Sequence, residues 1–245
     1  MDMTGEQNVK WEMSGCIGIL SIDLPPENRI TKPEFISIDK LSEWLAEPGL
    51  RGVIITGAGR HFSSGADITA LRKMAKDPEQ MLSQLQKGND LLNYIQNIPL
   101  PVIAAISGAC FGAGLEVALA CHIRICTENS LFAFPESALG IIPGLGGSAR
   151  LLKLTSVEAS MQLLFSGDVI DSQHAERVGI VDRIVPNKTV KEFAIDYLNK
   201  LVTNRPIYLI HSIMKSINNA RTLPMDEALK KESAMFCKLM AKAFQ

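Results

Sequence analysis

The sequence predicts an α/β protein with a helical carboxy-terminal part. Two short β-branched runs, at 52–57 (GVIITG) and 101–106 (PVIAAI), are bounded by glycine or proline and are typical of strands buried on both faces. Helical periodicity alternates with these runs, and no strand signal remains after Pro186. We therefore divide the chain into an α/β core, residues 1–186, and a helical region, residues 187–245.

Length and composition are those of a globular protein that can bury a sizeable core. The chain has 245 residues, of which 47% are hydrophobic and 21% charged. Its 25 Lys and Arg against 26 Asp and Glu leave a formal charge of −1, without blocks of like charge. We therefore expect no nucleic-acid partner and no membrane partner.

The amino terminus and the cysteines suggest a location. The segment MDMTGEQNVK carries two acids and no apolar run, so we expect no secretory signal peptide and a cytoplasmic protein. Five cysteines form no CxxC pair, so we expect neither a disulfide framework nor a metal site. Most of them should be small buried hydrophobic residues.

The individual elements follow from hydrophobic periodicity and from the glycines and prolines at their ends. Residues 9–22 alternate around Ser14-Gly15 and predict a β-hairpin. Further strands are predicted at 52–57, 101–106, 122–126, 130–134 and 178–185. Helices are predicted at 34–46, from near Thr69, from Pro78 to before Pro99, at 115–121, after 143 to about 154, and at 156–165, 188–204, 206–220 and 224–244.

Residues 101–121 carry a single charge, Glu116, and are long enough to resemble a membrane span. The stretch opens with a β-branched run and contains Gly108, Gly112 and Gly114. This pattern favours a strand, a glycine turn and a buried helix over a membrane span.

Two glycine turns follow buried strands and precede helices. They are GAGRHFSSGADI at 57–68 and SGACFGAGLE at 107–116. Such a loop directs free backbone N–H groups at a common point, where an anion or a developing oxyanion can be held. Taken alone, the first turn favours an ordinary strand-to-helix loop, because glycine-rich turns are common.

Two glutamates stand at the ends of apolar elements. Glu116 lies among leucine, valine and alanine at a helix start, where a carboxylate needs a partner or a chemical role. Its partner could instead be Arg124 or a nearby helix terminus. Glu136 follows an apolar strand and a proline, and it could simply be a capping charge at a helix start. Two glutamates beside two N–H donors can move protons next to a polarised carbonyl, as acyl thioester chemistry requires.

These motifs, with FAFPESALGIIPGLGGSARL and SGDVIDSQHAERVGIVDRIV further on, resemble the crotonase (enoyl-CoA hydratase/isomerase) superfamily over residues 9–236. The resemblance implies a spiral of ββα units, residues 1–186, that binds and converts acyl-CoA. It implies an oligomerisation or lid region at 187–245 and a homotrimer or dimer of trimers. It implies no metal and no cofactor, because coenzyme A belongs to the substrate.

The resemblance also implies residue roles. The oxyanion-hole N–H groups fall on Ala66 and Ala113, and the catalytic glutamates of hydratases fall on Glu116 and Glu136. The implied substrate-binding residues are Ala66, Asp67, Ile68, Thr69 and Ala113, although Asp67 is expected mainly to cap the following helix.

The implied function is an enoyl-CoA hydratase of fatty acid metabolism, a lyase that adds water across the 2,3-double bond. An isomerase, decarboxylase or hydrolase acting on the same thioester enolate is the alternative. A non-catalytic acyl-CoA-binding subunit is an alternative of another class, against which the presence of both glutamates argues.

The sequence departs from the family pattern at three places. Ala113 replaces the usual glycine, which requires backbone angles that suit an L-residue. His122 replaces the usual aspartate and is expected to be a strand-face residue. The family tail normally continues past ESAMFCKLM with a further helix on a neighbouring subunit. Here we expect part of the CoA or acyl-tail enclosure to be open or supplied differently.

Overall fold

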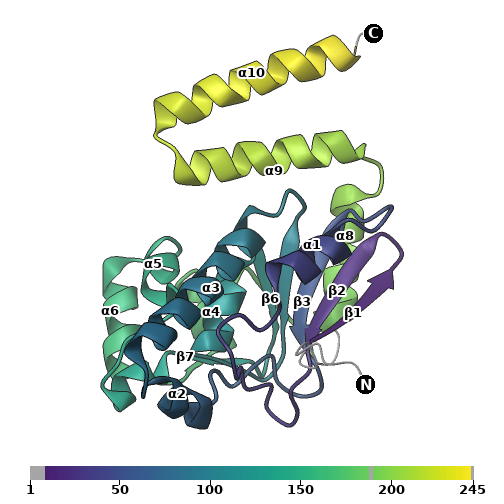
Figure 1. Ribbon diagram of the computed structural model, residues 1–245. Coiled ribbons are helices and arrows are strands. Elements are labelled where there is room, and N and C mark those ends of the chain that lie inside the picture. Colours follow the sequence, from purple (N-terminus) through teal and green to yellow (C-terminus); the bar gives the residue numbers. More distant parts are fainter. Residues whose placement is uncertain (1–8, 188–189, 244–245) are drawn as a thin grey trace.

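The computed structural model describes residues 9–187 and 190–243 and shows two sheets surrounded by helices (Figure 1). The larger sheet has the strand order β1-β2-β3-β4-β6-β9, and the smaller has the order β5-β7-β8. The strands are β1 Val9–Ser14, β2 Ile17–Ile22, β3 Gly52–Gly57, β4 Val102–Ile106, β5 Ala109–Phe111, β6 Ile123–Thr127, β7 Leu131–Ala133, β8 Ile170–Asp171 and β9 Arg183–Val185. The large sheet is parallel except for the β1–β2 hairpin.

The helices lie between the strands and beyond the last one. They are α1 Ile38–Leu45, α2 Ile68–Met74, α3 Pro78–Asn97, α4 Ala113–Ala120, the 3₁₀ helix η1 Pro135–Leu139, α5 Gly147–Leu152, α6 Val157–Ser166, α7 Ser172–Arg177, α8 Val190–Val202, α9 Ile207–Thr222 and α10 Met225–Ala243. This mixed α/β architecture with a helical carboxy-terminal part confirms the predicted fold class.

Most of the predicted elements are present. The hairpin at 9–22 and the strand at 52–57 are confirmed, and the strand at 101–106 begins one residue later. The helix predicted from 34 begins only at Ile38, because the Ser37 side chain accepts a hydrogen bond from the Lys40 amide and caps it.

Two element predictions are wrong. The second glycine turn contains a strand, β5, and the helix after it begins at Ala113, two residues before the predicted start. The strand predicted at 178–185 is reduced to β9, since α7 ends at Arg177 and Gly179 takes a left-handed φ of +88°. The buried residues Ile180 and Val181 lie in the turn that follows α7, and both donate to Ala175 O.

The core lies between the large sheet and the helices on its faces. The inner strands β3 and β4 are buried almost throughout, as their continuous apolar runs predict. The helix α8 packs against β2, β3, β4 and β6. Helix α4, buried at every position, runs from the small sheet into the body of the molecule.

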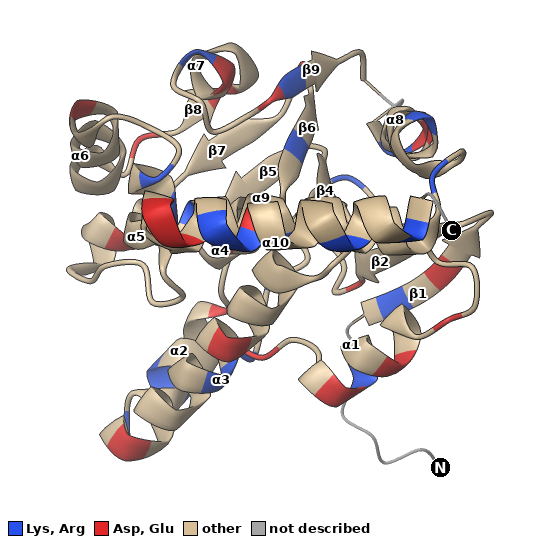
Figure 2. Ribbon diagram, turned by 90° about the horizontal axis from the view of Figure 1, so that it is seen from above, with Lys and Arg blue, Asp and Glu red and all other residues tan. Residues whose placement is uncertain are grey.

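The last two helices form an arm. Breaks at Pro206 and Pro224 separate α8, α9 and α10, and α10 packs on α9 above the rest of the molecule (Figure 1). Seen from above, α10 carries both acidic and basic residues along its length (Figure 2). The predicted helices extend to residues 188–189 and 244, which lie outside the described residues, as does the segment 1–8 used for the signal-peptide expectation.

No helix in the described ranges is both long and apolar enough to cross a membrane. Residues 101–121 instead contain β4, β5 and α4. As predicted, most cysteines are buried, namely Cys110, Cys121 and Cys126, and all five are free thiols.

A buried arginine joins β6 to the chain that leads into β9. The Arg124 side chain is 4% exposed, and its Nη2 lies 2.7 Å from Asp182 Oδ2. The same guanidinium donates to the carbonyls of Ile180 and Cys121. Asp182 is its only ion-pair partner among the described residues.

We therefore expect Asp182→Asn to lower the free energy of unfolding by about 2 kcal/mol. Breaking a fully buried pair costs roughly 3–5 kcal/mol, and Asp182 is partly exposed. Glu227→Gln, which removes the exposed Glu227–Lys231 pair of α10, is the control and should change stability by less than about 0.5 kcal/mol. Urea unfolding measures both, and equal effects would contradict the role given to Asp182.

Candidate active site

Three extended segments from distant parts of the sequence lie side by side. Ser63 pairs with β5, since its amide donates to Ala109 O and its carbonyl accepts from the Phe111 amide, both at 3.0 Å. On its other side this segment pairs with Ile30, whose amide donates to Gly65 O at 2.8 Å and whose carbonyl accepts from the Asp67 amide at 2.9 Å. Backbone groups alternate in direction along an extended chain. The N–H of Ala66 therefore points away from Ile30.

The Ala113 amide lies close to this segment. A Cβ atom built on Gly65 would lie 3.8 Å from Ala113 N. Ala113 is the first residue of α4, so its N–H has no acceptor within the helix. No hydrogen bond from the amides of Ala66 or Ala113 is found within 9–187 and 190–243. The structure thus brings together the two N–H groups that the sequence predicts as an oxyanion hole.

Ala113, which stands where the family usually has glycine, has backbone angles that suit an L-residue. The left-handed backbone of this turn falls on Gly112, with φ +45°, and Ala113 is not among the positive-φ residues. An L-residue therefore fits at position 113 without strain.

Glu116 lies one helical turn after Ala113 and is only 2% exposed. Its Oε1 accepts hydrogen bonds from the amides of Leu145 and Gly147, each at 2.7 Å. The prediction that Arg124 could be the partner of Glu116 is wrong, because Arg124 pairs with Asp182. The alternative of a nearby helix terminus is correct, because Gly147 is the first residue of α5.

The pKa of Glu116 reflects opposing effects. Burial raises it to about 7, and the negative charge of Glu136 acts in the same direction. The two amide hydrogen bonds and the charge of Arg150 act to lower it. A carboxyl group balanced in this way can both hold and release a proton near neutral pH.

Glu136 reaches the same place from β7. Because β7 runs parallel to β5 and Ala133 O accepts from the Gly112 amide, the chain after β7 lies beside the start of α4. A Cβ built on Gly112 would lie 2.7 Å from Glu136 Oε1, so only glycine leaves room for this carboxyl group. Burial raises the pKa of Glu136. Its Oε2 is buried and has no hydrogen-bond partner in the described part of the chain, which a capping charge does not explain.

The other predicted substrate-binding residues lie at the start of α2. Asp67 caps this helix, as expected, by accepting from the Ala70 amide at 2.7 Å. Ile68 and Thr69 are exposed in its first turn. The three residues follow Ala66 directly and therefore flank the predicted oxyanion hole on one side.

The expectation that His122 is a strand-face residue is wrong in position, because β6 begins at Ile123. Its Nδ1 accepts from the Val102 amide at 3.0 Å, and its Nε2 lies 3.1 Å from Gln96 O. Burial lowers the pKa of His122 to about 4, so the ring is a neutral structural link between α3 and β4.

Sequence reasoning read the PGLGG motif only as the start of a helix and missed its contact with Glu116. A Cβ built on Gly147 would lie 3.0 Å from Glu116 Oε1, and one built on Gly146 would lie 2.5 Å from Arg150 Nη1. The signal in the sequence was the number of glycines in this motif. Such a glycine-rich loop allows buried polar groups to approach its backbone closely.

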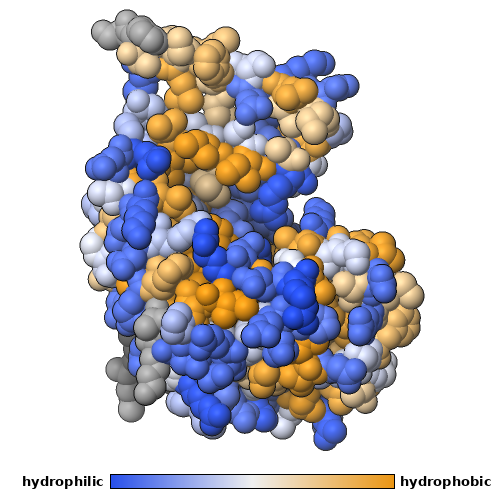
Figure 3. All heavy atoms as spheres, turned by 180° about the vertical axis from the view of Figure 1, so that it is seen from behind, coloured by the Kyte–Doolittle hydropathy of each residue, from blue (hydrophilic) through white to orange (hydrophobic). Residues whose placement is uncertain are grey.

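Two cavities lie elsewhere in the described structure. One, of about 860 Å³, separates α9 from the body of the molecule and is lined by Arg124, Arg150 and Met214. It opens into the hollow beneath the arm, where apolar residues gather (Figure 3). The other, of about 1210 Å³, is lined by Gly57, Ser107 and Thr127 at the ends of β3, β4 and β6. Neither is lined by Glu116 or Glu136.

Comparison with known proteins agrees with this geometry. Enoyl-CoA hydratase structures from Polaromonas sp. JS666 and Thermoplasma volcanium superpose with TM-scores of 0.87 and 0.85 at 28% and 30% identity. They align with 94% and 96% of this chain and with 90% and 92% of their own chains.

Among curated proteins, the fatty acid oxidation complex subunit alpha of Shewanella frigidimarina is 34% identical over 87% of this chain. The match covers only 31% of that protein, so the chain spans about a third of the length of this relative. The family model for enoyl-CoA hydratase/isomerase matches residues 19–245. The chain therefore belongs to the enoyl-CoA hydratase/isomerase family, that is, to the crotonase superfamily.

Proposed function

We propose that the protein is an enoyl-CoA hydratase that adds water across the 2,3-double bond of an enoyl-CoA thioester. One observation carries the proposal. The carboxyl groups of the buried Glu116 and the half-buried Glu136 meet at the start of α4, beside the amides of Ala66 and Ala113, which have no acceptor among the described residues. The set combines an electrophilic site for a carbonyl oxygen with two groups that can transfer protons.

The thioester carbonyl oxygen is proposed to lie between the N–H groups of Ala66 and Ala113. Both donors belong to backbone that is held by other hydrogen bonds, so they need little reorganisation as charge develops on the oxygen. The positive end of the α4 dipole adds to the same field. Each donor of this kind is typically worth ~10²–10³ in rate.

The two glutamates divide the proton transfers. Glu116 accepts two amide hydrogen bonds and serves as the carboxylate that, with Glu136, holds the water and takes its proton. The hydroxide adds to the β-carbon, and the electron pair of the double bond moves towards the thioester oxygen. Glu136 then delivers the proton taken from the water to the α-carbon, so that hydroxide and proton are both added and the two carboxyl groups return to their starting state. Acid–base help of this type contributes ~10²–10⁴ in rate.

The alternatives differ in their need for Glu116. A family isomerase acts mostly through the second glutamate alone, and a non-catalytic acyl-CoA-binding subunit needs neither carboxyl group. Burial opposes the ionisation of Glu116. A position with a purely structural role would avoid this cost by carrying an apolar residue. This favours the hydratase over both alternatives.

The wider setting is part of the proposal. The name of the Shewanella relative refers to fatty acid oxidation, and we place this enzyme in fatty acid metabolism. Assembly as a homotrimer or dimer of trimers and a cytoplasmic location are proposed with it. The arm formed by α9 and α10 presents exposed Ile213 and Ile217, which a neighbouring subunit could cover.

The first prediction tests the function. Glu116→Gln and Glu136→Gln should each lower the hydration of crotonyl-CoA at least ~100-fold, because each removes a proton-transfer group. The measurement is the loss of conjugated-enoyl absorbance, with binding of the thioester followed by calorimetry and expected to stay nearly unchanged. Glu158→Gln, an exposed glutamate in the first turn of α6, is the control and should retain wild-type activity. Near wild-type hydration by either catalytic variant would exclude the two-glutamate mechanism.

The second prediction concerns the donor at Ala113. Ala113→Gly should keep turnover within about 3-fold, since the N–H remains and the backbone is ordinary here. Ala113→Val places a stiff β-branched group at a buried helix start and should lower turnover at least ~10-fold. Thermal unfolding of both variants separates a displaced donor from a lost fold. Full activity in a folded valine variant would mean that the second donor is another amide of the turn.

The third prediction concerns stability. A carboxyl group whose pKa is raised on folding opposes the folded state increasingly as pH rises from its unfolded value, near 4.5, to about 7. Glu116→Gln keeps an oxygen acceptor for Leu145 and Gly147 but cannot ionise. The variant should therefore unfold at a higher temperature than wild type at pH 8, and the difference should shrink towards pH 5. A difference in melting temperature that does not change with pH would show that folding does not raise the pKa of Glu116.

A further inference from the structure

Arg150 is a buried arginine of α5, 9% exposed, that lies behind the loop holding Glu116. Its three guanidinium nitrogens all donate hydrogen bonds, and all three acceptors are neutral oxygens. No carboxylate pairs directly with it among the described residues, in contrast to Arg124. An arginine buried without a direct counter-charge is costly, so its placement calls for an explanation.

The contacts of Arg150 lead to Glu116 through one residue. Arg150 Nη1 donates to Leu145 O at 2.5 Å, while the amide of the same Leu145 donates to Glu116 Oε1 at 2.7 Å. Leu145 is thus held from both sides, by the guanidinium behind it and the carboxylate in front. The carbonyl that Arg150 holds belongs to the peptide unit between the two units whose N–H groups bind Glu116.

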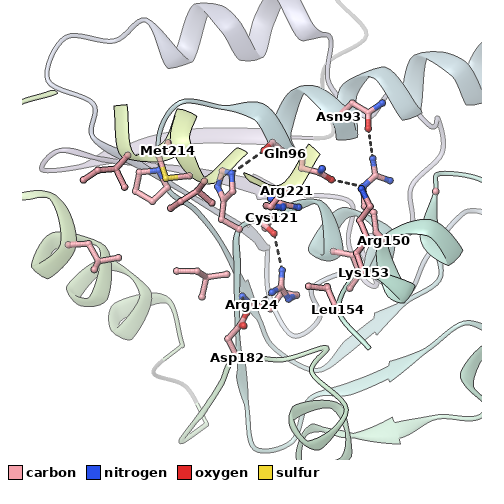
Figure 4. Close-up of a pocket in the computed structure, with 18 of the residues that line it drawn as sticks. Asn93, Gln96, Cys121, Arg124, Arg150, Lys153, Leu154, Asp182, Met214 and Arg221 are labelled. Atoms are coloured by element: carbon pink, nitrogen blue, oxygen red, sulfur yellow. Dashed lines mark hydrogen bonds and ion pairs between the residues drawn. The ribbon is translucent and has the colours of Figure 1, made fainter. Parts of the chain in front are cut away.

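The other nitrogens anchor Arg150 to α3. Nη2 donates to Asn93 Oδ1 at 2.8 Å and Nε to Gln96 Oε1 at 3.2 Å (Figure 4). Helix α3 is a long helix fixed in the core by buried leucines and Ile95. The guanidinium therefore ties the 145–147 loop to a rigid element, beside the Asn89 side chain of the same helix, which donates to Gly144 O at 3.3 Å.

The local sequence permits this close approach. A Cβ on Gly146 would lie 2.5 Å from Arg150 Nη1, and Gly146 has a left-handed φ of +82°. Any side chain at 146 would displace the guanidinium or strain the backbone. Gly146 thus leaves room for Arg150, and the adjacent Gly147 leaves room for Glu116.

Electrostatics acts in the same direction as the hydrogen bonds. The charged groups that act on Glu116 are Arg150 of α5 and Glu136 of η1, and the positive charge of Arg150 lowers the pKa of Glu116. Burial lowers the pKa of Arg150, and the positive charge of Arg221 of α9, which lines the same cavity, acts in the same direction. Removing Arg150 should therefore make the Glu116 carboxylate harder to form.

We propose that Arg150 is a positioning residue for hydration, which holds the Leu145 amide on Glu116 Oε1 and keeps that carboxylate directed at the reacting water. The inference rests on the proposed hydratase function. Arg150 touches neither substrate nor reacting atoms, and it acts through Leu145.

The experiment compares Arg150→Met and Arg150→Lys with Arg124→Met. Arg124 is the matched control, because it is an equally buried arginine that lines the same cavity and donates to backbone carbonyls without contacting the 145–147 loop. Circular dichroism and thermal unfolding identify the conditions in which each variant is folded, and crotonyl-CoA hydration is measured there.

We expect Arg150→Met to lower kcat ~10- to 100-fold with KM changed less than about 3-fold, as for a misaligned catalytic group. The acid limb of its kcat profile should shift to higher pH, since Glu116 loses a stabilising positive charge. Arg150→Lys keeps the charge but can reach fewer acceptors, so it should retain a near-normal limb and an intermediate kcat. Arg124→Met should lose stability but keep the kcat and pH profile of wild type.

Chemical rescue provides a second measurement. The cavity of about 860 Å³ beside Arg150 is open to solvent and lets a small guanidinium ion reach the space left by Arg150→Ala. We expect millimolar ethylguanidinium to restore hydration by that variant at least ~5-fold and to leave wild type and Arg124→Met unchanged. Absence of rescue in a folded Arg150→Ala variant, or a wild-type kcat and pH profile in Arg150→Met, would overturn the proposal.

A readout independent of activity separates this inference from the function. The carboxyl carbon of Glu116 can be titrated by carbon-13 NMR, with Glu116→Gln providing its assignment. A higher titration midpoint in Arg150→Met supports the positioning role even if wild type does not hydrate crotonyl-CoA, in which case only the proposed function fails. An unchanged midpoint overturns the positioning role.

Discussion

The architecture of the site depends on one buried interaction, the carboxylate of Glu116 held by the amides of Leu145 and Gly147. A carboxyl group inside an apolar helix would ordinarily be expelled or kept protonated. Two short hydrogen bonds to a single oxygen reduce that penalty. The pKa of Glu116 is therefore about 7, close to neutral pH. The loop at 145–147 must therefore keep its conformation for Glu116 to stay both buried and reactive.

Close backbone approach is what permits this arrangement. Gly112 leaves room for Glu136, Gly147 for Glu116, and Gly146 for Arg150, and a Cβ at any of these positions would come within about 3 Å of the polar group. The three glycines belong to two loops that the sequence places more than 30 residues apart. Their common function is to let polar groups lie against the backbone without solvent between them.

The spiral of strands provides the second constraint. Segment 63–66 lies between Ile30 and β5, and the chain after β7 lies beside Gly112, so backbone hydrogen bonds set the spacing of both amides and of Glu136. Donors fixed by a hydrogen-bonded backbone are already oriented before substrate binds, which is the main requirement of electrostatic catalysis. Within residues 9–187 and 190–243, the arm supplies none of these groups, and its helix α9 instead lines the cavity behind Arg150.

The sequence by itself determined the strands at 52–57 and 101–106, the two glycine turns and the positions of Glu116 and Glu136, because periodicity and glycine placement are local properties of the chain. It could not reveal β5, whose three residues pair with Ser63 and β7 in the described part of the chain, nor decide between the two partners considered for Glu116. Local rules offered Arg124 or a nearby helix terminus. In the tertiary structure Arg124 pairs with Asp182, and Glu116 accepts from the loop that begins α5, 29 residues away at Leu145. Such contacts depend on which distant segments the fold brings together, and so only the tertiary structure decided how the carboxylate is held and that Arg150 stands behind it.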